Sequence, residues 1–131
     1  MEISSLAARI VESVLEIAKA QPACEIIKVR LRLGDLIFIE AEQLRFCYRS
    51  MVRKTPLENS VLKIERVPPT VQCSHCHYVG DPKYWQHPFM SAAVPTLECP
   101  CCGKAAQATR GLECQIKSVQ LFNPAAAQVV A

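Results

Sequence analysis

Two short cysteine pairs constrain this chain more than any other feature of its sequence. Cys73 and Cys76 form one C-x-x-C pair, and Cys99 and Cys102 form a second. Each short turn presents two sulfurs to one ion, so two such pairs predict a closed tetrathiolate site, for which Zn²⁺ is the typical metal. Because four thiolates leave no open coordination position, this zinc is expected to be structural.

The second pair lies in "ECPCCGK", where three cysteines crowd together. Only Cys99 and Cys102 have the C-x-x-C spacing, and Cys101 is predicted to point away as a spare thiol. The fixed backbone of Pro100 and the conformational freedom of Gly103 suit a turn that folds back toward the sulfurs.

The segment around the pairs has little regular apolar pattern. Residues 71–110 hold five of the eight cysteines and all three histidines. Such a segment cannot easily build a core of its own. Metal binding in small zinc domains contributes about 10–16 kcal/mol, so we expect the metal to order this segment.

Regular patterns precede this segment. Between Ile3 and Ala18 the apolar residues recur at helical spacing, and Pro22 ends the predicted helix. The stretch "EIIKVRLRL" then alternates, which predicts a half-buried strand. Its predicted inner face consists of Ile27, Val29, Leu31 and Leu33.

A second helix and two more strands complete the pattern. Residues from Glu40 to Lys54 are amphipathic at helical spacing, "SVLKIERV" predicts a strand closed by Pro68 and Pro69, and "GLECQIKSVQLF" predicts a third strand. The predicted fold is α/β (α+β): a small sheet of about three strands packed with two helices, plus an inserted zinc-ribbon-like tetracysteine domain.

The predicted domain division follows from this order. Residues 1–70 together with 109–122 form the α/β domain, and residues 71–108 form the zinc-binding insertion. The tail, residues 123–131, has no charge and no pattern and is predicted to be disordered.

The start of the chain predicts a cytoplasmic protein with no membrane partner. Glu2 and Arg9 interrupt any signal-peptide pattern, and no apolar run approaches the roughly 20 residues of a membrane span. In that compartment cysteines serve as metal ligands or free thiols rather than disulfides. Cys24, Cys47 and Cys114 are predicted to be small core or near-core residues.

Other function classes fit the composition poorly. Four thiolates and one Zn²⁺ subtract two charges and lower the formal net charge from +3 to +1, which is weak for nucleic-acid binding. No nucleophile–base signature or phosphate loop indicates an enzyme. A remote alternative is electron transfer, since the cysteine pairs look like the iron-binding knuckles of rubredoxins. However, His77 replaces the glycine usual there.

Over roughly residues 1–122 the chain resembles the HypA/HybF family of hydrogenase maturation nickel metallochaperones. The matching stretches are "SLAARIVESVLEIAK", "IIKVRLRLGDL", "EQLRFCYRSMVRKTPLENSVLKIERVP", the paired knuckles with "CPCCG", and "GLECQIKSVQL". The resemblance implies Ni²⁺ as transient cargo for [NiFe]-hydrogenase and, in some organisms, urease. It also implies two partners, a maturation GTPase of the HypB type and a hydrogenase large-subunit precursor.

The amino terminus departs from this family. Its members begin Met-His-Glu and bind nickel there, whereas this chain begins Met1-Glu2-Ile3 and has no terminal imidazole. The amine of Met1 and the amide nitrogen of Glu2 could still form part of a square-planar Ni²⁺ site. Two alternatives stay open. One is a diverged homologue that binds zinc and a partner but not nickel, and the other is a site completed by a histidine of the insertion, His75, His77 or His87.

Two further groups invite functional hypotheses. Arg45, Arg49 and Arg53 recur at i,i+4 positions and predict a basic stripe for an acidic partner, the alternative being a solvated face paired with carboxylates such as Glu42. Tyr84 and Trp85 are predicted to pack over the metal knuckles rather than to bind a ligand.

Overall fold

The computed structural model describes residues 2–89 and 92–125. The chain divides into two compact units. Unit 1 contains the described parts of Met1–Leu31, Ile39–Glu65 and Gln115–Ala131, and unit 2 contains Arg32–Phe38 and Arg66–Cys114. The division at residues 71 and 108 that the sequence suggests stays a prediction.

The first helix confirms the prediction from periodicity. Helix α1 spans Ile3–Ala20 and ends just before Pro22, where the backbone N–H of Gln21 still donates to the carbonyls of Ile17 and Ala18. One stripe of α1 is buried, as an amphipathic helix on a core requires. It consists of Leu6, Ala7, Ile10, Val11 and Val14.

The second helix is shorter than its pattern predicts. Helix α2 spans Ala41–Met51, and the chain then turns. Thr55 closes this turn, because both its backbone N–H and its hydroxyl donate to the carbonyl of Val52, at 3.1 and 2.6 Å. Lys54 adopts a positive φ of 61°, which a continuing helix cannot accommodate.

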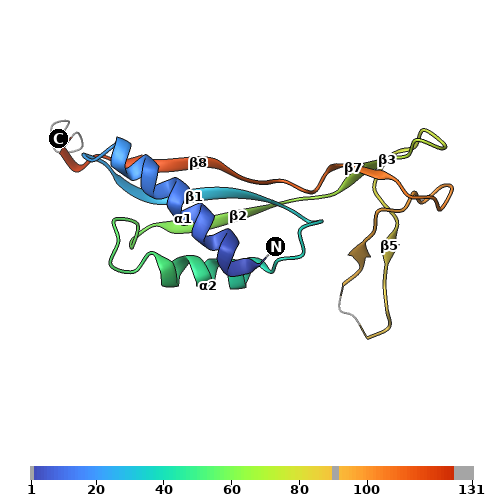
Figure 1. Ribbon diagram of the computed structural model, residues 1–131, viewed down its shortest axis with the longest axis horizontal. Coiled ribbons are helices and arrows are strands. Elements are labelled where there is room, and N and C mark those ends of the chain that lie inside the picture. The colour runs from blue at the N-terminus through green and yellow to red at the C-terminus, as the bar shows by residue number, and fades with distance from the viewer. Residues whose placement is uncertain (1, 90–91, 126–131) are drawn as a thin grey trace. The chain divides into compact units, whose positions relative to one another are not determined.

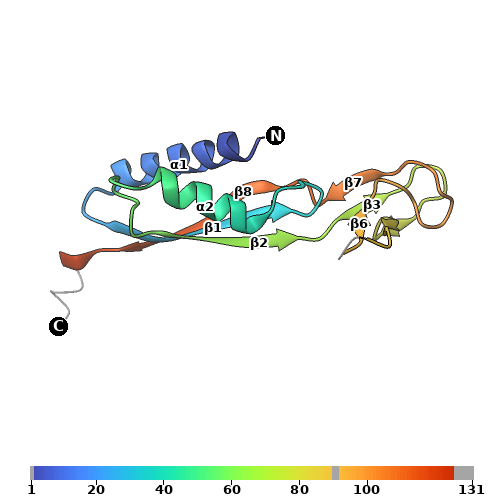
Figure 2. The same ribbon diagram turned by 90° about the horizontal axis from the view of Figure 1, so that it is seen from below.

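The two helices lie on the same face of a mixed three-stranded sheet (Figure 2). Strands β1 (Glu25–Gly34), β2 (Val61–Val67) and β8 (Cys114–Phe122) are ordered β2-β1-β8, with β1 in the centre. Val29, Leu31 and Leu33 of β1 are buried as predicted, whereas Ile27 is only half-buried. The predicted helix and strand content is therefore confirmed.

A polar pair is buried where α2 approaches the start of β2. The Tyr48 side chain is fully buried, and its hydroxyl lies 2.5 Å from Oγ of Ser60. Ser60 in turn donates to the carbonyl of Leu57 at 2.6 Å. Burial raises the pKa of Tyr48, although the hydrogen bond with Ser60 works in the opposite direction.

Unit 2 contains a small antiparallel sheet and a separate hairpin (Figure 1). The sheet is ordered β4-β3-β7, from strands Val79–Gly80, Thr70–Gln72 and Gln107–Arg110. The hairpin pairs β5 (Tyr84–Trp85) with β6 (Val94–Pro95).

Two further expectations from the sequence concern membrane-spanning helices and the C-terminal tail. No helix among the described residues is long and apolar enough to cross a membrane. Of the tail predicted to be disordered, residues 126–131 lie outside the described residues.

Candidate metal centre

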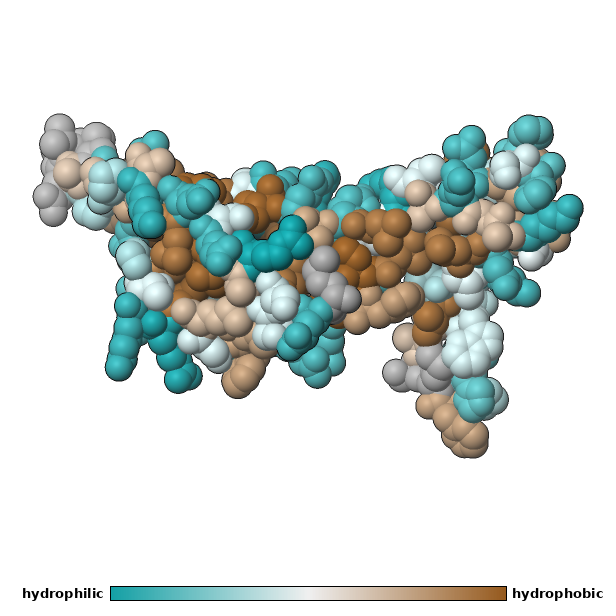
Figure 3. All heavy atoms as spheres, viewed as in Figure 1, coloured by the Kyte–Doolittle hydropathy of each residue, from teal (hydrophilic) through white to brown (hydrophobic). Residues whose placement is uncertain are grey.

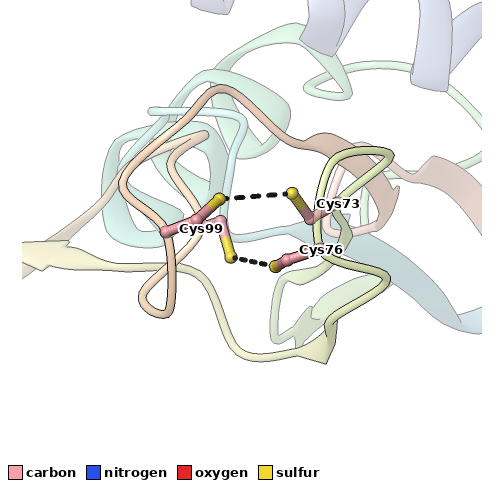
Figure 4. Close-up of side chains that lie close together, drawn as sticks. Cys73, Cys76 and Cys99 are labelled. Atoms are coloured by element: carbon pink, nitrogen blue, oxygen red, sulfur yellow. Dashed lines mark hydrogen bonds between the residues drawn. The ribbon is translucent and has the colours of Figure 1, made fainter.

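Four cysteines of unit 2 converge on one point. The sulfur atoms of Cys73, Cys76, Cys99 and Cys102 all lie within 4.8 Å of one another. Figure 4 shows the two turns facing each other, each contributing two thiols. The Cys73 and Cys102 sulfurs are 3.6 Å apart, and the Cys76 and Cys99 sulfurs are 3.5 Å apart. In the part of the chain that the structure describes, no other group of His, Cys, Asp or Glu side chains has this geometry.

The two turns have the same hydrogen-bonding pattern, which explains how they present their sulfurs. In the first turn the Cys73 N–H donates to the Tyr78 carbonyl at 2.8 Å, and the His77 N–H donates back to Cys73 at 3.1 Å. In the second turn Cys99 donates to Lys104 at 2.8 Å, and Gly103 donates back to Cys99 at 2.9 Å. The bonds have the same sequence offsets in both turns, so each C-x-x-C pair is held in a closed loop.

His77 and Gly103 occupy equivalent positions in these turns. Both adopt a left-handed backbone, with φ of 63° at His77 and 76° at Gly103. Glycine adopts this conformation without steric cost, and histidine is among the residues that tolerate it. His77, which replaces the glycine of the rubredoxin pattern, therefore adopts the same turn conformation as Gly103.

The cysteine cluster fits a tetrahedral metal ion. With Zn–S bonds of about 2.3 Å, the edge of a tetrahedron of sulfurs is about 3.8 Å. The Cys73–Cys102 and Cys76–Cys99 sulfur distances, 3.6 and 3.5 Å, lie slightly below that value. An all-thiolate tetrahedral donor set suggests zinc and leaves no position for a substrate.

The thiols of the cluster differ in how readily they ionise. At Cys99 burial raises the pKa, but the backbone N–H groups of Cys102 and Cys101 outweigh it and lower the pKa to about 7. At Cys76 the Tyr78 N–H favours the thiolate, yet Cys99 and burial raise the pKa to about 12. A divalent cation between the sulfurs would stabilise all four in the thiolate form.

The cluster rests on a small core that the sequence patterns do not reveal. Val71, Cys73, Cys99 and Ala106 are buried together, and Tyr78 packs against them. The prediction that Tyr84 and Trp85 cover the knuckles is wrong, because they are 44% and 54% exposed on the β5–β6 hairpin. Tyr78 lies two residues after Cys76, and its carbonyl closes the first turn, so the turn itself brings its ring to the cluster. This position in the sequence is the signal that could have identified Tyr78.

The remaining cysteines lie outside the cluster. Cys101 is exposed, as expected of a spare thiol. Partial desolvation and the charges of Cys99 and Cys102 raise its pKa. Cys24, Cys47 and Cys114 are half-buried.

The residues considered for nickel belong to different units of the chain. Met1 lies outside the described residues, and Glu2 is exposed at the start of α1, where its carboxylate accepts a hydrogen bond from Ser4 at 2.8 Å. The histidines named from the sequence are exposed and take no part in the cysteine cluster. They are His75, His77 and His87.

The arginine stripe is interrupted by the end of α2. Arg45 and Arg49 lie one turn apart on α2, whereas Arg53 lies in the turn that follows. Arg45 forms an ion pair with Glu42. Arg49 and Arg53 are exposed and form no ion pair with any described residue.

The fold and the cysteine cluster define a class: a small α/β protein with a tetracysteine metal site that is closed to substrate. Residues 1–121 match the family described as hydrogenase/urease nickel incorporation metallochaperone, HypA. The chain belongs to the HypA family of hydrogenase maturation nickel metallochaperones, which confirms the predicted family, function and non-enzymatic class.

Related sequences and structures agree with this assignment. The chain is 35% identical to a hydrogenase maturation factor HypA of Methanosarcina mazei, over 89% of this chain and 90% of the relative. It is 36% identical to the protein of the same name from Methanosarcina barkeri, over 89% and 92%. A solution structure of the Ni metallochaperone HypA from Helicobacter pylori shares the fold, with a TM-score of 0.63 and 17% identity over 93% of this chain and 98% of that chain.

Proposed function

We propose that this protein carries Ni²⁺ to a hydrogenase precursor while a resident Zn²⁺ holds the tetracysteine cluster together. The observation that carries the zinc assignment is the convergence of four sulfurs within 4.8 Å. Cys73, Cys76, Cys99 and Cys102 supply the ligands, and the ion orders the insertion, residues 71–108, which has only a small core.

The cargo ion requires a separate site. A saturated tetrathiolate cannot bind and release Ni²⁺ without losing its own metal. The terminal amine of Met1 and the amide nitrogen of Glu2 offer the nitrogen donors that Ni²⁺ prefers. The family resemblance supports this location, although this chain has no histidine near Met1.

Docking is proposed for the arginines of α2 and the following turn. Arg49 and Arg53 are exposed cations with no ion-pair partner among the described residues, and Arg45 lies one helical turn before Arg49. An acidic surface of a HypB-type maturation GTPase is the partner that fits this charge. The delivered nickel would then enter a hydrogenase large-subunit precursor, with urease as the second candidate recipient.

A nickel titration by calorimetry tests the cargo function. The titrated protein is zinc-loaded and carries no tag, so that the Met1 amine is native. We expect one-to-one binding that disappears when a Gly-Ser extension precedes Met1, because the amine is then displaced. The triple variant His75→Ala, His77→Ala, His87→Ala should bind as the wild type does.

The same titration decides between the alternatives. No heat of binding in the wild type would establish the diverged homologue that keeps zinc but lacks nickel. Loss of binding in the histidine variant would instead place the nickel site partly in the insertion.

Charge reversal tests the GTPase contact. The double variant Arg49→Glu, Arg53→Glu should weaken GTPase binding at least tenfold, with a weaker salt dependence. Lys19→Glu, which reverses an exposed cation on α1, is the matched control and should have little effect.

A further inference from the structure

The β5–β6 hairpin of unit 2 exposes large apolar side chains that the metal site does not use. We call residues 84–89 and 92–97 the aromatic hairpin. Phe89 is 93% exposed, Trp85 is 54% exposed and Tyr84 is 44% exposed. Leu97 is 49% exposed at the end of the second arm. Figure 3 shows the region that contains this hairpin, below β7 in the view of Figure 1. Hydrophobic (brown and tan) and intermediate (white) residues lie there beside hydrophilic (teal) ones.

The exposed rings form an ordered array. Trp85 is the last residue of β5, and His87 and Phe89 follow in the segment after the strand, where their rings lie next to one another in series. The ring centroids of Trp85 and His87 are 6.0 Å apart, and those of His87 and Phe89 are 5.3 Å apart. The Phe89 N–H donates to Nδ1 of His87 at 3.2 Å, which orients the central ring. An array held in this way loses less conformational entropy when it binds a partner.

The base of the hairpin is also held in place. The Lys83 carbonyl accepts from the Thr96 N–H at 3.0 Å and from the Thr96 hydroxyl at 2.6 Å. The Lys83 N–H donates to the Glu98 carbonyl at 2.9 Å. These bonds join the two arms to the segment that leads into Cys99.

The aromatic hairpin contains no acidic residue, lysine or arginine. From Tyr84 to Leu97 the sequence contains no Asp, Glu, Lys or Arg. Lys83 directly precedes the hairpin in the sequence, and its Nζ lies 3.9 Å from the Glu98 carboxylate at the base. Membrane-binding loops for anionic lipids and surfaces for acidic partners need cations, so this surface fits an uncharged apolar partner instead.

The area of the patch indicates a small, transient interface. Aromatic side chains offer 150–250 Å² each, so the exposed fractions of Tyr84, Trp85 and Phe89 amount to about 400 Å². Apolar patches of this size on monomers are often functional. Two copies meeting through this patch alone would bury about 800 Å², below what a stable dimer needs.

We propose that the aromatic hairpin inserts into an uncharged apolar groove of the enzyme precursor. This inference rests on the proposed delivery function and adds a recognition element to it. Because metal binding is coupled to folding, we expect an enzyme that lacks its metal centre to expose apolar surface that is buried later. Such surface complements the hairpin, and Trp and Tyr are the residues that most often dominate binding energy at interfaces.

Fluorine NMR and calorimetry test this proposal with the zinc-loaded full chain. Trp85 is the one tryptophan of the sequence, so incorporation of 5-fluorotryptophan gives a single ¹⁹F signal from the hairpin. The probe is the recombinant hydrogenase large-subunit precursor. We expect the signal to shift or broaden on addition of precursor, and Phe89→Ser to weaken the measured affinity at least tenfold.

The controls separate the hairpin from general surface effects. Phe46→Ser removes a 64% exposed aromatic ring from α2 and should leave precursor affinity unchanged. Both variants should keep the zinc content of the wild type, because neither residue belongs to the cysteine cluster or to the small core around it.

The proposal would be overturned if Phe89→Ser bound the precursor with wild-type affinity, or if Phe89→Ser and Phe46→Ser lost equal affinity. It would also be overturned if the wild type did not bind the precursor. A ¹⁹F signal that responds to phosphatidylglycerol vesicles or to self-association, but not to precursor, would overturn it as well. Nickel and GTPase binding are measured independently on Phe89→Ser. If the variant retains them, failure of the docking inference remains distinct from failure of the delivery function.

Discussion

Gly34 and Gly111 meet backbone to backbone, so that a Cβ atom on Gly34 would lie 2.0 Å from the carbonyl oxygen of Gly111. The same segments are hydrogen-bonded, because the Leu36 N–H donates to Gly111 at 2.8 Å and the Gly34 N–H donates to Glu113 at 2.7 Å. Any side chain at position 34 would separate these two segments of unit 2.

Gly34→Ala should therefore lower the free energy of unfolding by about 3 kcal/mol or more, since a backbone clash cannot be relieved by a rotamer change. Gly103→Ala is the control, because its φ is 76° but a Cβ there would meet nothing within 4 Å. It should cost only about 1–2 kcal/mol. Urea unfolding of the zinc-loaded proteins measures both, and equal losses would contradict the close approach.

His77 should behave as a left-handed turn residue and not as a metal ligand. His77→Gly should leave stability within about 1 kcal/mol of the wild type, because relief of strain and added unfolded-state entropy largely cancel. His77→Val should cost about 2 kcal/mol, since a β-branched residue resists positive φ. Thermal unfolding measures the difference, and altered cobalt absorption in His77→Gly would contradict this role.

The two cysteines that follow Pro100 should differ sharply. Cys102→Ser should reduce zinc affinity by orders of magnitude and abolish the tetrahedral tetrathiolate spectrum of the Co²⁺-substituted protein, because one of four sulfurs is lost. Cys101→Ser should retain both, because Cys101 is exposed and outside the cluster. Metal analysis and cobalt absorption distinguish them, and the reverse result would reassign the ligand.

The buried Tyr48–Ser60 pair predicts an unequal response to deletion. Ser60→Ala leaves the buried Tyr48 hydroxyl without its partner and should cost about 1–3 kcal/mol. Tyr48→Phe leaves Ser60 still donating to Leu57 and should cost about 1 kcal/mol. Denaturant unfolding measures the loss of unfolding free energy in both variants. A larger loss in Tyr48→Phe than in Ser60→Ala would contradict this prediction.

Glu113 should contribute stability that disappears in acid. Burial raises the pKa of Glu113, but the N–H groups of Gly111, Glu113 and Leu112 outweigh it and lower the pKa below the ordinary glutamate value of 4.5. A lowered folded pKa gives stability that is present above about pH 4.5 and is lost as pH falls through the folded pKa.

The measurement compares wild type with Glu113→Gln from pH 8 downward. The wild type should be more stable by less than about 1 kcal/mol near neutral pH, because the carboxylate is partly exposed. The difference should shrink below pH 4.5, whereas a difference independent of pH would refute the ionic contribution. Glu12→Gln on the exposed face of α1 is the control.

The sequence by itself determined the local structure and the metal cluster. The spacing of Cys73, Cys76, Cys99 and Cys102 predicts the converging sulfurs because each knuckle closes within a few residues. The apolar stripe of α1 predicts its buried face for the same reason, since a helix repeats every few residues. Local geometry of this kind can be read from the order of residues.

Only the tertiary structure decided which side chains have neighbours. Tyr78 packs on the cysteines whereas Tyr84 and Trp85 are exposed, although all three aromatic residues follow the first knuckle. The contact of Gly34 with Gly111 joins positions far apart in the chain. Burial depends on which distant segments meet, and a one-dimensional pattern does not contain those contacts.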